Sequence, residues 1–255
     1  MAKSSLLEIV QDILSDMDSD EVNSIADTPE SLQVAQIVKS VYEELMANKN
    51  WPHLRTLFTL NASGDSNKPT HMKSPDDLKE LELLKYNKIK TGETKARYQD
   101  VIFLHPDEFL IKLNNRNSDH DDVDVISDFS GVELLIKTEK APEYWTSFDD
   151  EWLVFDSYDS TVDATLQSSK TQLLGFRWPV FTLSDEFVPD LPQEAFPMLL
   201  AEAKSTCFAR IKQMPDAKSE QQATRSKNWM SRKAWQNAGG IRFPDYGRKS
   251  RKGRR

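Results

Sequence analysis

The chain has 255 residues, of which 38% are hydrophobic and 29% are charged, a composition sufficient for one large or two small packed domains. No apolar run approaches the roughly 20 residues that a membrane-spanning helix needs, so we expect a soluble protein without a membrane partner. The single cysteine, Cys207, excludes an internal disulfide and any metal site built from several thiolates.

The N-terminal part of the chain has the sequence signals of two helices. Residues 5–17 place apolar side chains at helical spacing, and Ser5 begins a Ser-x-x-Glu capping box. A second helix begins after Thr28, a favoured N-cap residue, with Pro29 in its first turn, and it runs out near residues 48–50. Each helix has one apolar face, so we expect the two helices to pair.

From Trp51 to about Pro189 the sequence changes to short apolar runs, rich in β-branched and aromatic residues and separated by turn-forming clusters. This pattern predicts a β-rich region. The candidate strands are residues 54–60, 81–86, 101–104, 109–113, 123–126, 132–136, 152–155 and 176–181.

Helical spacing returns in residues 193–213 and again in a polar segment, about 216–236, which a following Gly-Gly pair would end. Pro197 is difficult to place in the first of these helices. A proline inside a helix removes a backbone hydrogen bond and clashes with the preceding turn, so we expect the first turn to be separate or kinked.

These patterns predict an α+β fold. In it, the N- and C-terminal helix pairs form a four-helix bundle, a β-rich domain is inserted between the pairs, and an extended arm follows. The predicted segments are residues 1–50 for the N-terminal helix pair, 51–190 for the β-rich insertion, 191–238 for the C-terminal helix pair and 239–255 for the basic docking arm.

The net charge of -8 conceals a strong asymmetry along the chain. Residues 201–255 contain fifteen Lys or Arg and four Asp or Glu, a net charge of +11, which leaves -19 for the rest of the chain. An acidic body with a basic end indicates a tail that binds an acidic protein surface or nucleic acid, or that only aids solubility.

The arm and the helix before it supply the candidate partner-binding residues. Six of the last eight positions are Lys or Arg, and aromatic residues precede them. The arm residues that would bind a partner are Phe243, Pro244, Tyr246, Arg248, Lys249, Arg251, Lys252, Arg254 and Arg255. A second set of candidate residues lies on the last predicted helix and consists of Trp229, Arg232, Lys233 and Trp235. This set suits an interface, although core packing explains its tryptophans equally well.

The sequence lacks the motifs of NTPases, hydrolases, dinucleotide-binding proteins and thiol redox enzymes, and its four histidines are scattered. Packing explains Cys207, which lies on an apolar helix face. The acidic residues 119–128 could collect a calcium or magnesium ion, but without EF-hand spacing a solvated loop is the simpler interpretation. We therefore expect no cofactor, no metal and no enzyme activity. A rival interpretation is an enzyme that uses the dispersed carboxylates Glu133, Asp149, Asp150 and Asp156.

The order of these segments is informative. Two N-terminal helices lead to a tryptophan-bearing junction, residues 42–51, and a β-rich insertion follows. The chain returns through a Leu-Pro-acidic turn, residues 187–194, into a helix pair with Ala-Glu-Ala-Lys at residues 201–204. This arrangement resembles the head-to-tail adaptors of short-tailed bacteriophages, also called tubular tail protein A. It departs from that family at Gln193, which precedes the acidic residue, at Pro197, and in its marked basic extension.

The resemblance implies a structural protein of the virion, made in the host cytoplasm, at the junction of head and tail. Such adaptors form a ring, commonly of twelve copies, beneath the portal. The implied partners are the portal protein, the tail nozzle or tail tube protein and neighbouring copies of the chain, with transient contact to DNA during packaging and ejection. The basic arm would dock on the portal. The alternative is a nucleic-acid-binding protein that uses the basic C-terminal segment.

Overall fold

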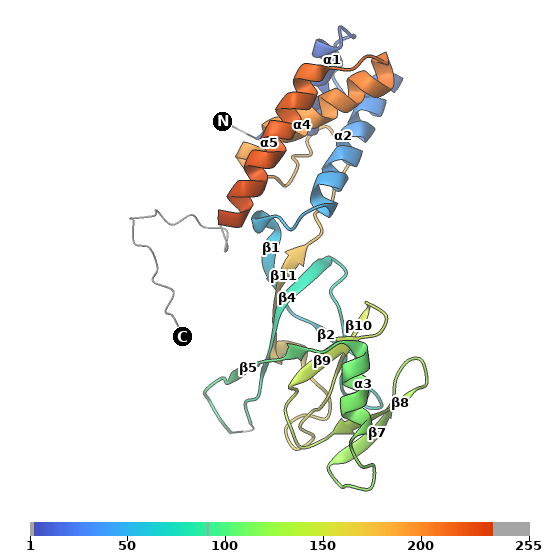
Figure 1. Cartoon of the computed structure of the whole chain (residues 1–255), viewed down its shortest axis with the longest axis vertical. Helices are drawn as coiled ribbons and strands as arrows, with labels where there is room; N and C mark the ends of the chain where they lie inside the picture. The colour runs from blue at the N-terminus through green and yellow to red at the C-terminus, as the bar shows by residue number, and fades with distance from the viewer. Residues whose placement is uncertain (1–2, 91, 237–255) are drawn as a thin grey trace, which may run out of the picture. The chain divides into compact units, whose positions relative to one another are not determined.

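The structure is a computed structural model that describes residues 3–90 and 92–236, and the chain divides into two compact units (Figure 1). The first unit combines residues 1–54 with residues 179–255, and the second unit is residues 55–178. The described part of the first unit is helical, whereas the second contains three sheets and one α-helix. The fold is therefore mixed α+β.

Helix α1 (Leu6–Asp16) begins at the predicted cap. The Ser5 hydroxyl accepts a hydrogen bond from the Glu8 amide at 3.3 Å, and the Ser5 amide donates to Glu8 Oε2 at 3.1 Å, which confirms the capping box. The Leu6 amide donates to the carbonyl of Phe187 at 2.7 Å. The segment that precedes the C-terminal helices thus satisfies a backbone donor that the first turn of α1 leaves open.

Helix α2 (Pro29–Ala47) confirms the second predicted helix and its proline in the first turn. Thr28 caps it reciprocally with Ser31, whose amide donates to the Thr28 hydroxyl at 3.0 Å. After the helix ends, the buried Trp51 indole donates to the carbonyl of Leu45 at 2.8 Å. This bond holds the junction against the last turn of α2.

The C-terminal helices are α4 (Phe196–Cys207), which continues through a π-helical turn (Phe208–Lys212), and α5 (Ala217–Gln236). A separate 3₁₀ turn (Gln193–Ala195) precedes α4. Pro197 therefore lies in the first turn of α4, where backbone amides have no hydrogen-bond acceptor within the helix and a proline costs no bond. The predicted break before Pro197 is confirmed. Helix α4 contacts α1, α2 and α5.

The second unit holds two larger sheets and a hairpin. The first sheet, all antiparallel, has the order β1 (Arg55–Phe58), β11 (Thr171–Arg177), β4 (Leu78–Asn87), β5 (Tyr98–Asp100). The second has the order β2 (Asn61–Ala62), β3 (His71–Lys73), β10 (Trp152–Phe155), β9 (Tyr144–Ser147), β6 (Ile102–Phe103), with only the β6–β9 pair parallel. The hairpin pairs β7 (Val123–Ser127) with β8 (Glu133–Lys137). Their shared core includes the fully buried Phe109, Ile136, Phe155 and Leu173.

The predicted strand at residues 109–113 is wrong, because these residues belong to helix α3 (Pro106–Asn114). A proline and two acidic residues occupy its first turn, and the buried Phe109 and Leu113 lie four residues apart on one helix face. The predicted strand at residues 176–181 is also misplaced. Strand β11 ends at Arg177, since Pro179 follows within two residues and cannot donate to a sheet.

The remaining predicted strands overlap observed strands. The predicted strand at residues 101–104 contains β6, which has only two residues, and β5 ends just before it, at Asp100, in the other sheet. The short strands β2, β3, β5 and β9 were not predicted. Each has four residues or fewer, which is too short for a clear alternation of apolar and polar side chains.

Candidate functional site

The candidate interface on α5 is only partly described. The helix is net basic, with five Lys or Arg and one Glu, and it turns the buried Ala223 and Met230 inward. Trp229 is 53% exposed and Arg232 is also exposed, so Trp229 is not a core residue in this structure. The side chains of Lys233 and Trp235 lie outside the described residues. So do all the predicted arm residues, Phe243, Pro244, Tyr246, Arg248, Lys249, Arg251, Lys252, Arg254 and Arg255.

A groove of about 490 Å³ lies between α1, α4 and α5 in the first unit. Its acidic edge is Glu8, Asp12 and Asp16, which stand four residues apart and so share one face of α1. Its apolar part includes Phe196 of α4. Lys204 of α4 forms an ion pair with Asp16, and the edge keeps a net negative charge. This groove is suited to a basic segment that also carries apolar side chains.

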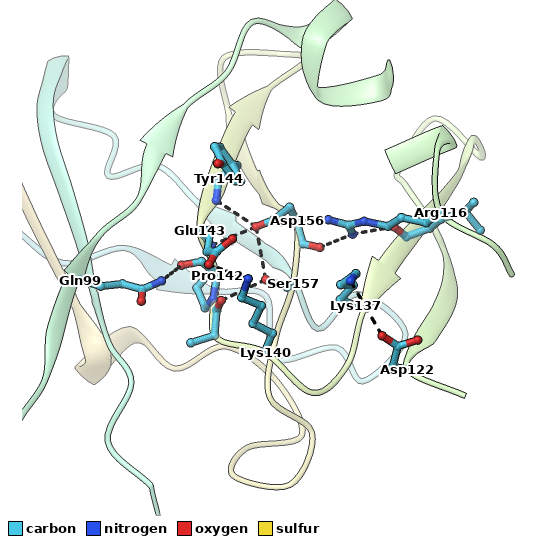
Figure 2. A network of polar contacts seen from close by, with 12 residues as sticks. Gln99, Arg116, Asp122, Lys137, Lys140, Pro142, Glu143, Tyr144, Asp156 and Ser157 are labelled. Atoms are coloured by element: carbon cyan, nitrogen blue, oxygen red, sulfur yellow. Dashed lines mark hydrogen bonds and ion pairs between the residues drawn. The ribbon is translucent and has the colours of Figure 1, made fainter. Parts of the chain in front are cut away.

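The most deeply buried ion pair among the described residues joins Arg116, just after α3, to Asp156, just after β10 (Figure 2). Their side chains are only 8% and 4% exposed, and Arg116 Nη2 donates to Asp156 Oδ2 at 3.0 Å. Arg116 Nη1 also donates to the carbonyls of Leu135 on β8, at 2.9 Å, and of Asp156, at 2.6 Å. One guanidinium thus ties together the end of α3, strand β8 and the segment after β10.

The second carboxylate oxygen of Asp156 also accepts hydrogen bonds within the protein. Asp156 Oδ1 accepts hydrogen bonds from the amides of Glu143 at 3.0 Å and Tyr144 at 2.9 Å, and from the hydroxyl of Ser157 at 3.3 Å. Figure 2 shows the Glu143 and Tyr144 amides, at the start of β9, and the hydroxyl of the neighbouring Ser157 meeting at this oxygen. Because both oxygens are used inside the protein, Asp156 supports the fold and is not placed to act on a substrate.

The other carboxylates of the rival enzyme interpretation do not join Asp156. Asp149 Oδ1 accepts from the amides of Glu151 and Trp152, which makes it part of the turn between β9 and β10. Asp150, in the same turn, has a left-handed backbone with a φ of 61°. Glu133 is exposed at the start of β8. The structure assigns these three residues to turns and a strand end.

The acidic side chains of residues 119–128 interact with different residues of the second unit. Asp122 pairs with Lys137 at 3.9 Å, and Asp124 accepts from the Tyr158 hydroxyl at 2.9 Å. Burial and this carboxylate together raise the pKa of Tyr158 to about 12. Within residues 3–90 and 92–236, no group of three or more His, Cys, Asp or Glu side chains could hold a metal ion.

The buried histidine of strand β3 was not singled out from the sequence. His71 Nε2 lies 3.0 Å from Asp128 Oδ1, and burial lowers the pKa of His71 although Asp128 opposes this shift. Burial alone would raise the pKa of Asp128, but hydrogen bonds from Ser130 and His71 outweigh it and lower that pKa. A neutral imidazole that donates to a carboxylate follows. These partners are 57 residues apart in sequence, so no local pattern could reveal them.

Cys207 is fully buried on α4, which confirms its predicted place in the core. Burial raises the pKa of its thiol to about 12, so almost no thiolate is present near neutral pH. Cys207 is thus a packing residue.

No helix in the described part of the chain is long and apolar enough to cross a bilayer. No protein-family model matches the chain, and no curated protein matches it significantly.

Proposed function

We propose that this chain is a structural head-to-tail adaptor of a tailed phage virion, which forms a ring between portal and tail and lets DNA pass through. In this proposal α1, α2, α4 and α5 act as one four-helix bundle into which the β-rich unit is inserted. The protein works by assembly and needs neither a catalytic residue nor a cofactor.

The observation that carries the proposal is the separation of charge within the first unit. Glu8, Asp12 and Asp16 give α1 an acidic face, whereas α5 is net basic and exposes Arg225 and Arg232. Identical copies can place the basic helix of one against the acidic groove of the next. Such a head-to-tail contact uses two different surfaces and closes into a ring when the rotation between copies permits. The exposed Trp229 supplies an apolar anchor for the same contact.

The basic arm would dock on the portal. Its density of Lys and Arg gives charge-assisted contacts with an acidic partner surface, and Phe243 and Tyr246 provide aromatic anchors. Ordering such a segment costs free energy, so the contacts must be numerous. The other face of the ring would meet the tail nozzle or tail tube protein.

The test is electron microscopy of the purified chain mixed with a candidate portal protein. We expect the full-length chain to form rings on the portal, and a chain that ends at Gly240 to bind weakly or not at all. A charge reversal on the groove, Glu8→Lys with Asp12→Lys, should prevent ring closure, whereas the control Glu44→Lys on the exposed face of α2 should not. Portal binding by neither the full-length nor the shortened chain refutes the adaptor proposal.

A second candidate function, nucleic-acid binding, is favoured by the net basic α5 with its exposed Trp229 and by the basic arm that follows. Its test is a mobility-shift titration of DNA over a range of salt concentrations. A full-length chain that shifts DNA at moderate salt and binds no portal would establish this alternative in place of the adaptor.

A further inference from the structure

The second unit contains a pocket of about 300 Å³ where α3, the β7–β8 hairpin and the β9–β10 hairpin meet. Buried Leu134 and Val154 contribute to its lining. Phe129, in the β7–β8 turn, and Trp152, on β10, form an aromatic wall with ring centroids 4.5 Å apart. The pocket is therefore apolar inside and has the volume to enclose a bulky side chain.

Large apolar side chains remain exposed around the pocket. Phe129 is 50% exposed, Val132 is 55% exposed and Phe148 is 40% exposed, and all three line the same pocket. Single exposed apolar residues are ordinary, but several gathered around one concave site indicate a binding surface.

The exposed Phe129 ring is held in place by its neighbours. Asp128 is anchored by His71 and by the Ser130 amide and hydroxyl, at 3.1 Å and 2.8 Å. The His71 ring meets Phe129 edge to face, with centroids 5.5 Å apart. Lys68 Nζ lies 4.3 Å from the Phe129 centroid and donates to the Ser127 carbonyl. A wall fixed before binding lowers the entropy cost of binding a partner.

The charge at the pocket is net negative, although Lys68 lies against the Phe129 ring. Asp128 and Asp149 are among its lining residues, and no Lys, Arg or His is among them. The turn beside it adds Asp150 and Glu151, although Glu151 pairs with Lys73. An apolar cavity with carboxylates beside it is complementary to an apolar group next to a positive charge.

We propose that this pocket binds an aromatic or large aliphatic side chain of a partner protein, carried on an extended segment with a lysine or arginine within two residues of it. The apolar side chain fills the cavity between Phe129 and Trp152, and the cation lies near Asp128 and Asp149. Exposed Val132 and Phe148 cover the flanking backbone. The interaction belongs to the second unit and does not depend on the ring.

The test is a nuclear magnetic resonance titration of the full-length chain, labelled with ¹⁵N, using two dipeptide probes. N-acetyl-Phe-Arg-amide and N-acetyl-Phe-Glu-amide share the aromatic group and differ in charge. The Trp152 indole signal, assigned through Trp152→Phe, should shift and saturate in the millimolar range. At low salt the Phe-Arg probe should bind about three- to fivefold more tightly than the Phe-Glu probe, the scale of an exposed ion pair.

Matched variants separate the two parts of the proposal. Phe129→Ser should abolish the shift, whereas Ile111→Ser, which removes a 63% exposed side chain from α3 outside the pocket lining, should not. Asp149→Asn should reduce the preference for Phe-Arg, and Asp107→Asn should leave it unchanged. No shift with either probe overturns the pocket as a binding site. Equal affinity for both probes overturns its preference for basic segments.

Discussion

Replacing Arg116 with alanine should cost the second unit more stability than any exposed charge does. The substitution removes the guanidinium that donates to Asp156 Oδ2 and to two carbonyls, while Asp156 stays 4% exposed. Removing one partner of a buried ion pair generally costs about 3–5 kcal/mol, because the remaining charge has no compensation. Here Asp156 keeps three donors on its other oxygen, which places the expected loss at about 3 kcal/mol.

The matched control is Arg55→Ala. Arg55 also forms a short ion pair, at 2.6 Å with Glu82, but the two side chains are 27% and 42% exposed. Water screens such a pair, so its loss should cost about 1 kcal/mol or less. Both variants remove an arginine from the same unit, so the comparison contrasts a buried, multiply hydrogen-bonded guanidinium with a partly exposed ion pair.

Urea unfolding followed by tryptophan fluorescence measures both variants. Because the chain has two compact units, unfolding need not be two-state, and hydrogen exchange of β8 to β10 assigns the change to the second unit. Arg116→Ala should lower the unfolding midpoint and speed hydrogen exchange in these strands. Arg55→Ala should have nearly the same midpoint and exchange rates as the wild-type chain. Equal losses of stability in the two variants would refute the conclusion that the buried Arg116–Asp156 ion pair stabilises the second unit.

Three further outcomes follow from single buried groups. The pKa of His71 in the folded protein is lowered from about 6.5, so the second unit should lose stability as pH falls below about 6.5. His71→Gln should weaken this pH dependence, which urea unfolding at pH 7.5 and at pH 5.5 measures. An unchanged slope in His71→Gln would contradict the assignment. Gly175→Ala should destabilise by about 1–3 kcal/mol, because the new methyl would lie 2.5 Å from the carbonyl oxygen of Glu80, and a wild-type melting temperature would refute this. Cys207 should not react with a disulfide reagent at pH 8 until the chain unfolds, and rapid reaction of the native protein would show the thiol to be accessible.

Local signals account for the parts of the fold that the sequence predicts well. The ends of α1 and α2 depend on Ser5, Thr28 and Pro29, residues whose effects extend over one helical turn. The error at residues 109–113 has the same origin. A five-residue apolar run fits a strand or a helix face, and only the proline and acidic residues at positions 106–108 favoured the helix.

The buried Arg116–Asp156 ion pair and the aromatic pocket could not be predicted from the sequence, because contacts between distant segments create them. Arg116 and Asp156 are 40 residues apart, and no spacing rule connects an arginine after one helix to an aspartate after a strand in another hairpin. Phe129 and Trp152 likewise come from turns and strands whose pairing is set by the sheets. The distribution of charged residues along the sequence did indicate the charge asymmetry, because the net charge of a segment does not depend on how the chain folds.

The two proposals can fail independently, because they depend on different units. The groove charge reversal changes α1 in the first unit, and Phe129→Ser changes the β7–β8 turn in the second unit. If the chain is an adaptor, the groove variant should lose ring closure and still bind the Phe-Arg probe, whereas Phe129→Ser should form rings and lose the probe. A chain in which either variant abolished both properties would have units that depend on each other for folding. Urea unfolding of each variant would reveal this as a loss of stability in the unit that was not changed.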